Sequence, residues 1–302
     1  GIAHRVRLFA VDFDDTCTEG DTTSLLPAAA ALAADTPEKR TQIRSQWHNL
    51  TDLFLSGYTA VMAETASRPK TASGSALAPD LERLRAFLAR LANEDRSSIA
   101  RVVESGVLAG LTRPGLRRAM LGSCRKDWRV RPGMAATLHR AVAFPLETHV
   151  LSINWSVDVV RAILEDSLGH VDSAAVDANL DTSDGSDAGA ADGGTSGAAV
   201  LAAVHGGSDN GRDTGLTVYV GDSATDLLSM LSANVGIVVG GSASFACVCA
   251  AFGVEILPLQ SILHGGSDAA EDVLLAPTTL PGSRRAVYAA KGWDEIHAFL
   301  FG

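Results

Sequence analysis

Two pairs of aspartates follow apolar segments of the sequence at spacings that suit phosphate or metal chemistry. Residues 12–16 read D-F-D-D-T and come directly after an apolar run, while residues 221–226 read G-D-S-A-T-D. Because side chains alternate along a strand, Asp12 and Asp14 are expected to point the same way. Their mutual repulsion would be relieved by a bound cation or by a shared proton. The alternative for this motif alone is a solvated acidic turn.

The second pair adds oxygen ligands of the kind that Mg²⁺ takes from proteins. Asp222 lies at the end of a predicted strand, and Asp226 lies about one helical turn later on the same side. Gly221 would permit a tight turn or a close approach. The alternative is an N-cap followed by an acid at the helix N-terminus. Ser152 ends a third apolar run, where its hydroxyl could donate to a phosphate oxygen or serve as a cap.

Short apolar runs separated by helix-length segments predict the scaffold that positions these residues. Such runs are typical of parallel strands covered on both faces, so we predict a doubly wound, Rossmann-like three-layer α/β sheet. Ligands bind at the carboxyl ends of the strands in such sheets. The predicted strands are 5–13, His149–Ile153, Val171–Val176, Thr217–Val220 and Val235–Val239, with Val254–Leu257 as a candidate sixth.

About 130 residues separate the first two predicted strands, which is far more than a crossover helix needs. Helical spacing of apolar residues in Ile43–Tyr58 and Leu81–Leu91 predicts helices there, the second starting after Pro79-Asp80. We therefore predict a helical cap over residues 21–128, inserted into an α/β core of residues 1–20 and 129–302. Residues 181–215 are rich in Gly, Asp, Ser and Ala and are read as surface loop flanking a short apolar stretch.

Bulk composition excludes some classes of partner. The 302 residues carry a net charge of -10 without a basic run, which argues against nucleic acid, and the sequence contains no stretch of membrane-spanning length. The four cysteines fit neither a zinc site nor a disulfide framework, so we expect reduced, buried thiols in an intracellular protein. A cytoplasmic location is expected, with organelle targeting left open and protein partners undetermined.

The order of the motifs resembles that of the haloacid dehalogenase superfamily. D-x-D-x-T comes first, a strand ending in Ser follows, and G-D-x-x-x-D comes last. A narrower resemblance, from about residue 7 to 301, points to the thiamin monophosphate phosphatase half of bifunctional plant thiamin-salvage proteins. It is patchy in the insert and absent in 181–215. The segments that carry it are D-F-D-D-T-C-T at 12–18, R-V-V-E-S-G-V-L-A-G-L at 101–111, H-V-L-S-I-N-W-S at 149–156, V-Y-V-G-D-S-A-T-D-L-L and N-V-G-I-V-V-G within 218–240, F-G-V-E-I-L-P-L at 252–259 and W-D-E-I-H-A-F at 293–299.

This resemblance implies a magnesium-dependent phosphatase. Asp12 would attack phosphorus and form an aspartyl-phosphate, and Asp14 would protonate the leaving group and then activate water. Mg²⁺ would be bound by Asp12, the backbone carbonyl of Asp14 and Asp222, with support from Asp226. Thr16 and Ser152 would bind phosphate. Asp14 also favours phosphate chemistry, because superfamily members that cleave carbon–halogen bonds lack this second acid.

The sequence departs from the family at its third motif, which is a lysine or arginine that screens the nucleophile and the phosphate. None of Lys39, Lys70, Lys126 and Lys291 lies between Ser152 and Asp222, and Gly197 stands where the lysine would align. Either an arginine of that interval, Arg161 or Arg212, or Lys126 replaces it, or the enzyme is slow, or it is silent. A catalytically weak protein that binds phosphate or a protein partner is therefore one alternative function.

Thiamin monophosphate is the leading substrate on this resemblance, and a nucleotide or another vitamin phosphate is the alternative. A cap would close over the substrate, and an aromatic cage would suit a cationic thiazolium ring. The candidate substrate contacts are Trp47, Tyr58, Glu104, Asn154 and Trp155. Trp47 and Tyr58 fit the buried face of a helix equally well, and Glu104 fits a solvated helix position. His149, on a buried strand, is expected to be structural.

Overall fold

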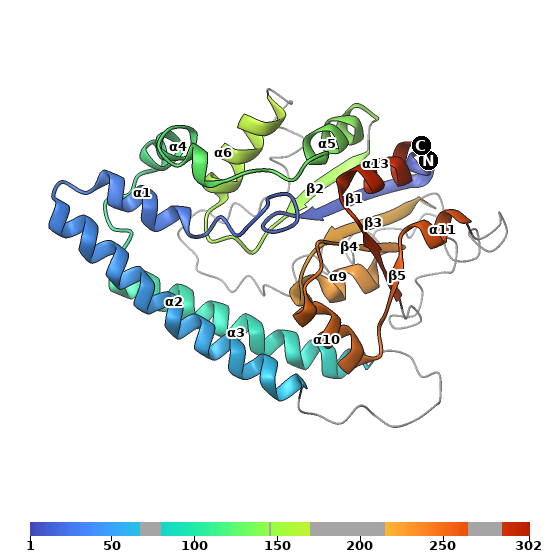
Figure 1. Cartoon of the computed structure of the whole chain (residues 1–302), viewed down its shortest axis with the longest axis horizontal. Helices are drawn as coiled ribbons and strands as arrows, with labels where there is room; N and C mark the ends of the chain where they lie inside the picture. Colours follow the sequence, from blue (N-terminus) through green and yellow to red (C-terminus); the bar gives the residue numbers. More distant parts are fainter. Residues whose placement is uncertain (67–79, 145, 170–214, 265–285) are drawn as a thin grey trace, which may run out of the picture.

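A computed structural model describes residues 1–66, 80–144, 146–169, 215–264 and 286–302. These residues form a six-stranded sheet with the order β2-β1-β3-β4-β6-β5, and every neighbouring pair is parallel (Figure 1). The strands are β1 Val6–Asp12, β2 Glu147–Leu151, β3 Leu216–Gly221, β4 Val235–Val239, β5 Glu255–Pro258 and β6 Ala286–Ala290. The predicted parallel α/β sheet is confirmed.

Both faces of the sheet are covered, as the apolar strands require. Phe9 and Val11 of β1 lie in one apolar cluster with α5 (Met134–Ala143), α6 (Val157–Leu168) and α13 (Trp293–Phe301). Leu8 and Ala10 face the other way, into a second cluster with α9 (Leu227–Ser232) and α10 (Ala243–Phe252). Strand alternation thus divides β1 between two cores, and the three-layer arrangement follows from it (Figure 1).

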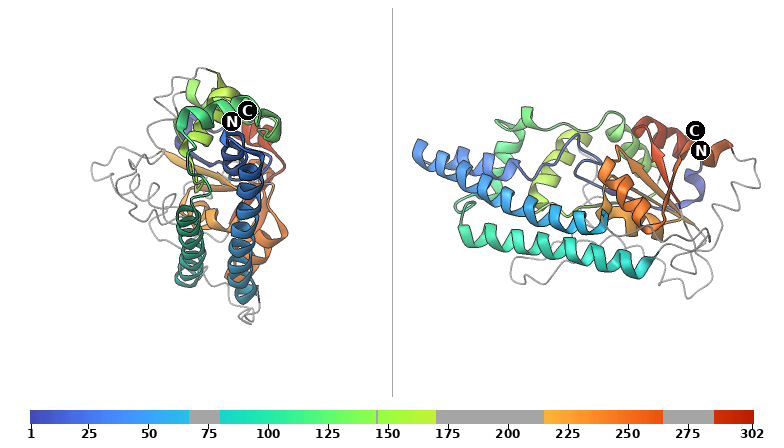
Figure 2. Two further views of the ribbon diagram at one scale, coloured as in Figure 1. Left: turned by 90° about the vertical axis from the view of Figure 1, so that its left-hand side faces the viewer. Right: turned by 60° about the horizontal axis from the view of Figure 1, so that its bottom comes forward.

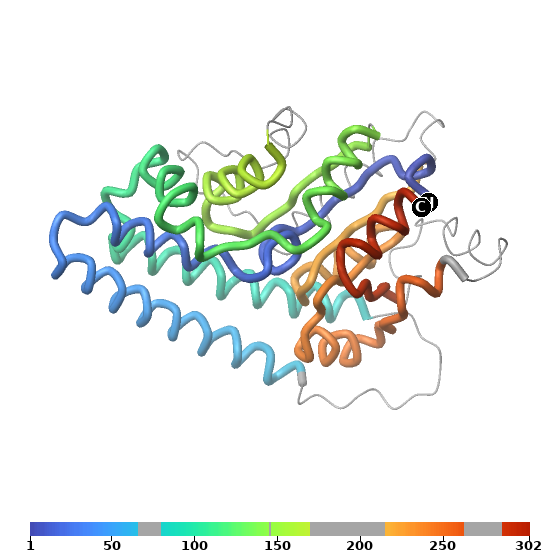
Figure 3. Tube along the Cα trace, turned by 45° about the horizontal axis from the view of Figure 1, so that its top comes forward, coloured from blue at the N-terminus to red at the C-terminus, as the bar shows by residue number. Residues whose placement is uncertain are grey.

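The segment between β1 and β2 contains four helices: α1 (Leu25–Ala33), α2 (Pro37–Ala66), α3 (Leu81–Ser105) and α4 (Arg113–Leu121). Helices α2 and α3 lie side by side and extend past the sheet (Figures 2 and 3). Both predicted helices are confirmed, and both are longer than predicted. Asp80 caps α3 as expected, because its side chain accepts a hydrogen bond from the backbone N–H of Arg83. The limits 21–128 of a separate cap stay a prediction.

The inserted helices pack against the apolar clusters on both faces of the sheet. Leu116 and Met120 of α4 are buried in the same cluster as Phe9 of β1. Leu84 and Leu91 of α3 are buried in the cluster on the opposite face. A small third cluster, with Ala30, Ile43 and Val102 among its members, joins α1, α2 and α3 to one another. The helices are therefore held at a fixed place beside the carboxyl edge of the sheet.

Several elements differ from the sequence-based expectation. Strand β6 was not predicted, because A-V-Y-A-A is short and rich in alanine, which is a poor strand former, yet it lies between β4 and β5. The candidate sixth strand is confirmed as β5, one residue further along. The predicted strand Val171–Val176 and most of the 181–215 loop lie outside the described residues. The remaining short elements are η1 Ala3–Arg5, η2 Arg125–Asp127, η3 Ala224–Asp226 and α11 Gln260–His264.

The four cysteines are free thiols, as expected. Cys17, Cys124 and Cys249 are buried, but Cys247 is exposed on α10, so the expectation of burial is wrong for that residue. Residues two apart on a helix point in different directions, which explains why only one member of the C-x-C pair reaches the core. None of the helices in the described ranges combines the length and apolar character needed to cross a membrane.

Candidate active site

The carboxyl edge of the sheet brings the two aspartate motifs together. β1 ends at Asp12, and the neighbouring strand β3 ends at Gly221, directly before Asp222. Carboxylate oxygens of Asp12, Asp222 and Asp226 all lie within 4.8 Å of one another. Three carboxylates at this separation form a set of hard oxygen donors of the kind that binds Mg²⁺. The two motifs therefore meet at one edge of the sheet.

Mutual repulsion and burial dominate the electrostatics of this cluster. Burial, followed by the charges of Asp226 and Asp222, holds the pKa of Asp12 well above its usual range. Burial and the charge of Asp226 raise the pKa of Asp222 to about 7. The buried Thr16 hydroxyl lies 3.0 Å from Oδ2 of Asp12 and 3.1 Å from Oδ1 of Asp222 and donates to them. A divalent cation would relieve the remaining repulsion, so the residues present fit a magnesium ion.

Asp226 shapes the turn on which Asp222 sits. Its Oδ2 accepts hydrogen bonds from the backbone N–H groups of Asp222, at 3.3 Å, and Ser223, at 3.1 Å, and from the Ser223 hydroxyl at 2.9 Å. Its Oδ1 accepts from the buried Tyr219 hydroxyl at 2.8 Å. A Cβ at Gly221 would lie 2.5 Å from Cγ of Asp226, so the predicted close approach at this glycine is confirmed. Capping is also present, with Ser223 rather than Asp222 as the N-cap.

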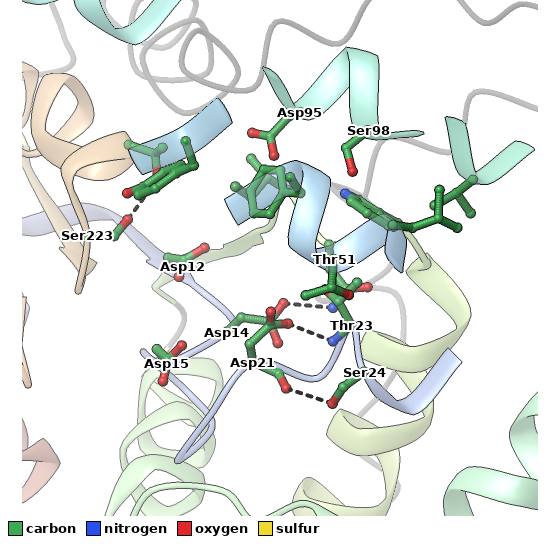
Figure 4. Close-up of a pocket in the computed structure, with 18 of the residues that line it drawn as sticks. Asp12, Asp14, Asp15, Asp21, Thr23, Ser24, Thr51, Asp95, Ser98 and Ser223 are labelled. Atoms are coloured by element: carbon green, nitrogen blue, oxygen red, sulfur yellow. Dashed lines mark hydrogen bonds between the residues drawn. The ribbon is translucent and has the colours of Figure 1, made fainter. Parts of the chain in front are cut away.

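Asp14 is held apart from the carboxylate cluster by hydrogen bonds of its own. Oδ1 accepts from the backbone N–H and the hydroxyl of Thr22, at 2.8 and 2.6 Å, and Oδ2 accepts from Nδ2 of Asn154 at 2.7 Å. Burial nevertheless raises the pKa of Asp14 against the opposing effect of these hydrogen bonds. A carboxyl with a raised pKa, fixed next to a carboxylate cluster, is suited to give and take a proton. Asp12 and Asp14 line the same cavity (Figure 4).

Arg131 is a basic residue at the site that the sequence analysis did not weigh as a replacement for the third-motif lysine. Its Nε donates to the backbone carbonyl of Asp15 at 2.8 Å, and its charge opposes the raised pKa values of Asp15 and Asp222. A Cβ at Gly240 would lie 2.6 Å from its Nη2, so the guanidinium crosses the end of β4 closely. The sequence signal is R-P-G at 131–133, which by itself indicates only the start of a helix.

Backbone pairing explains how Arg131 reaches this place from the far end of the insert. Thr18 and Val130 form an antiparallel bridge, and the Arg131 N–H donates to the Cys17 carbonyl at 2.8 Å. The chain that leaves the D-x-D-x-T motif thus runs beside the chain that returns from the insert. Asp15 has a φ of 56°, a left-handed conformation that only short polar side chains and glycine adopt readily. The Arg131 hydrogen bond stabilises that strained turn.

A cavity of about 350 Å³ opens above the aspartates, between the sheet edge and the helices α2 and α3 (Figure 4). Its acidic lining comes from the first motif and from Asp21, Asp95 and Asp222. Its aromatic lining comes from Trp47, Phe54, Tyr58 and Trp155. The described residues that line it include no lysine, arginine or histidine. Its size matches that of sites for small metabolites.

The predicted site residues divide into three groups. Seven line the cavity: Asp12, Asp14, Trp47, Tyr58, Asn154, Trp155 and Asp222. Thr16 and Asp226 are buried and contact the lining aspartates. Ser152 and Glu104 are not part of the lining; the Ser152 hydroxyl accepts from the N–H of Asn154 at 3.0 Å, and Glu104 is exposed.

The described candidates for the replacement of the third-motif lysine do not line the cavity. Lys126 is exposed in η2, and Arg161 lies on α6. Gly197 and Arg212 lie outside the described residues. His149 is buried on β2 and lies 3.0 Å from a carboxylate oxygen of Glu147, in keeping with its predicted structural role. Thr22 and Asp95 are further site residues that no motif indicated.

Comparison with known proteins gives one clear relative. The chain is 28% identical, over 310 aligned positions, to the protein named bifunctional TH2 protein, mitochondrial, from Arabidopsis thaliana. The alignment covers 96% of this chain and 48% of that protein, so the chain spans about half the length of its relative. No family model matches the chain.

Two solved structures are similar in part. A phosphoserine phosphatase with bound substrate shares 16% identity at a TM-score of 0.38, covering 80% of this chain and 89% of that one. A phospho-aspartyl intermediate analogue of phosphoserine phosphatase shares 14% identity at a TM-score of 0.35, covering 79% and 88%. The parallel sheet, the order of the motifs and the clustered aspartates, with the second acid Asp14 in place, agree with the resemblance to the haloacid dehalogenase superfamily that the sequence indicates.

Proposed function

We propose that the chain is a magnesium-dependent phosphomonoester hydrolase that works through an aspartyl-phosphate on Asp12, with thiamin monophosphate as its leading substrate. One observation carries the proposal: the two acids of the first motif have different surroundings. Asp12 belongs to the carboxylate cluster, whereas Asp14 is held beside it by hydrogen bonds from Thr22 and Asn154. A nucleophile and a separate proton donor are what two-step phosphoryl transfer requires.

In the first step, a carboxylate oxygen of Asp12 attacks phosphorus and the bond from phosphorus to the leaving oxygen breaks. Asp14 gives its proton to that leaving oxygen, and its raised pKa supports the protonated starting state. In the second step, Asp14 takes a proton from water as the water oxygen attacks phosphorus. The bond between phosphorus and Asp12 then breaks, which releases phosphate and restores both carboxyl groups.

Asp12, Asp222 and the backbone carbonyl of Asp14 would hold the magnesium ion. When bound, Mg²⁺ neutralises charge on the transferring phosphoryl group. Asp226 supports the site through its hydrogen bond from the Asp222 N–H. Thr16 orients the two carboxylates to which it donates. Ser152 remains a proposed phosphate ligand, although its hydroxyl is oriented by the Asn154 N–H and lies outside the cavity lining.

Arg131 supplies positive charge that the missing third-motif lysine would provide in other members of the superfamily. Its charge opposes the rise in the pKa values of Asp15 and Asp222, and its Nε donates a hydrogen bond to the backbone carbonyl of Asp15. The lack of a basic side chain among the described lining residues favours a second candidate function, a catalytically weak protein that binds its ligand without turnover. Turnover distinguishes the two.

The aromatic lining and the similarity to the TH2 protein support thiamin monophosphate as the substrate. Trp47 and Trp155 make an edge-to-face contact with ring centroids 5.8 Å apart, and Trp47 comes from the insert while Trp155 follows β2. Another small phosphorylated metabolite, such as a nucleotide or a different vitamin phosphate, is the alternative. The reduced thiols support an intracellular location.

Phosphate release from a panel of monoesters, with and without Mg²⁺, tests the proposal. Wild type is expected to turn over with Mg²⁺ only, and to prefer thiamin monophosphate by kcat/KM. Asp12→Asn is expected to lose at least about 1,000-fold in kcat. Asp127→Asn, at an exposed position of η2, is the matched control and is expected to keep full activity. A folded wild-type protein without turnover on any monoester supports the binding-protein alternative.

A further inference from the structure

The end of the cavity away from the metal cluster contains an acid of its own. Asp95 lies on α3 and faces the cavity together with Ser98 (Figure 4). The facing helix α2 contributes the rings of Trp47, Phe54 and Tyr58. This acid comes from the insert, whereas the metal cluster comes from the ends of β1 and β3. The cavity therefore has two acidic ends with aromatic walls between them.

Asp95 has no partner within the described part of the chain. No side chain or backbone group there donates a hydrogen bond to it, and no salt bridge includes it, while the adjacent Arg96 donates to Asn93. Burial raises the pKa of Asp95 to about 6, although Arg96 opposes that shift. A half-buried carboxylate without a partner is unfavourable in the free protein. That cost is offset where a bound ligand supplies the missing positive charge.

The rings near Asp95 are suited to the same ligand. Phe54 and Tyr58 have ring centroids 5.8 Å apart, and Trp47 contacts Trp155 at the same separation. Asp95 and Asp222 both raise the pKa of Tyr58, behind the effect of burial, so both acids lie near this ring. Aromatic faces attract cations and stack on flat rings. A positively charged heteroaromatic group could therefore stack on these rings and pair with the Asp95 carboxylate at the same time.

We propose that Asp95 is a specificity-determining residue, which pairs with the positive charge of a flat, cationic heteroaromatic leaving group while the phosphate of the same molecule meets the Asp12 cluster. This inference rests on the proposed hydrolase function. It predicts that the cavity selects phosphate monoesters by the charge of the leaving group. The acid at the far end acts on binding of that group and has no part in the bond-breaking steps.

Two substrates of different charge separate this role from a structural one. Thiamin monophosphate has a cationic ring, and p-nitrophenyl phosphate has a flat, uncharged one. Asp95→Asn is expected to lower kcat/KM for thiamin monophosphate about 10- to 100-fold, mainly through KM, because it removes one partner of a desolvated charge pair. For p-nitrophenyl phosphate we expect a change of less than about 2-fold. Asp52→Asn, exposed on α2 beside His48, is the matched control and is expected to leave both substrates unaffected.

Equal losses on the two substrates, or none on thiamin monophosphate, would overturn the assignment of Asp95. Wild-type turnover of p-nitrophenyl phosphate without turnover of thiamin monophosphate would also overturn it, while leaving the hydrolase proposal intact. If wild type hydrolyses no monoester, the hydrolase proposal fails, and binding of thiamin, followed by tryptophan fluorescence, decides the role of Asp95. Binding that weakens about 10-fold or more in Asp95→Asn supports the pairing, and unchanged binding or no binding contradicts it.

Discussion

The sheet edge and the helical wall of the cavity place their functional side chains in different ways. At the sheet edge, Asp12, Asp14 and Asp222 come from strand ends and are held by hydrogen bonds from hydroxyl and amide groups. On the helical wall, Tyr58 and Asp95 extend from α2 and α3 into the cavity, and Asp95 receives no hydrogen bond from any described residue. Side chains that are already held by hydrogen bonds suit the bond-breaking steps. Side chains whose partner would be the ligand suit discrimination between substrates.

This difference implies that substitutions can change the catalysed reaction and the choice of substrate separately. A substitution at the sheet edge is expected to affect every substrate, because every substrate reacts there. A substitution on the helical wall is expected to affect only those substrates whose leaving group contacts it. The two regions are nonetheless coupled in position, since α3 packs on the sheet layers through Leu84 and Leu91.

Among substitutions that keep the nucleophile Asp12, the largest effect is expected from the proton donor at the sheet edge. Asp14→Asn is expected to lower kcat for thiamin monophosphate by about 100- to 10,000-fold, because an alkoxide leaving group needs a proton. With p-nitrophenyl phosphate the first step needs no proton, so a burst of nitrophenolate is expected, followed by slow turnover. Stopped-flow absorbance measures both phases. An equal loss of activity on both substrates, without a burst of nitrophenolate, would contradict the proposed role. It would show that Asp14 is needed for the attack on phosphorus itself and not only for proton transfer.

The next effect concerns the metal. Asp222→Asn removes one carboxylate of the cluster, so the Mg²⁺ concentration for half-maximal activity is expected to rise about 10-fold or more. Titration of activity with Mg²⁺, on both substrates, measures the shift. The shift should be the same for either leaving group, because the metal acts at the sheet edge. An unchanged Mg²⁺ requirement would remove Asp222 from the ligand set.

A smaller effect is expected from Arg131. Arg131→Gln removes the charge near Asp15 and Asp222 and the Nε hydrogen bond, so kcat is expected to fall about 10-fold on either substrate. Arg131→Lys keeps the charge without the planar guanidinium and should recover part of the loss. Steady-state kinetics of both variants, with KM reported separately, provides the test. A loss confined to KM of one substrate would place Arg131 in selection instead.

The smallest effect is a pH-dependent gain of stability on the helical wall. Burial raises the pKa of Asp95 to about 6 in the folded chain, against 3.8 for an unperturbed aspartate, so ionisation favours the unfolded state. The resulting penalty is absent below pH about 4, grows as pH rises to about 6, and is complete above that value. Asp95→Asn should therefore raise the free energy of unfolding by roughly 1–2 kcal/mol at pH 8 and leave it unchanged at pH 4.

Chemical denaturation at the two pH values, without ligand, measures this difference, and titration of the aspartate cluster cancels between the two proteins. The Asp52→Asn control, at an exposed carboxylate, should show no such difference. A destabilised Asp95→Asn protein at pH 8 would mean that Asp95 has a favourable partner in the folded chain. It would also weaken the proposal that a ligand supplies that partner.

The sheet edge could be predicted from the sequence because its signals are local. Short apolar runs predict β1 and β3, and the acids that follow these strands lie within a few residues of their ends. Because parallel strands end at the same edge of a sheet, the sequence alone is enough to predict that Asp12 and Asp222 lie close together. Asp14 was predicted to point into the same site as Asp12, but its hydrogen bonds to Thr22 and Asn154 required the folded chain.

The remainder depends on contacts between distant parts of the chain. Arg131 reaches the site only because the chain leaving the first motif pairs with the chain returning from the insert, through the Thr18–Val130 bridge. Asp95 is one acid among several on an amphipathic helix, and only the packing of α3 against α2 turns it toward the cavity. Glu104, chosen from the same helix, is exposed. Helical periodicity gives a face, but it does not identify what that face contacts.

The most direct test of the central claim is to trap the reaction on the protein. Wild type and Asp14→Asn are mixed with p-nitrophenyl phosphate and Mg²⁺, quenched with acid within the burst, digested and examined by peptide mass spectrometry. The account predicts phosphate on Asp12, at higher occupancy in Asp14→Asn because the second step is slow, and none in Asp12→Asn. Turnover with no phosphorylated peptide, or phosphate on a residue other than Asp12, would contradict the account.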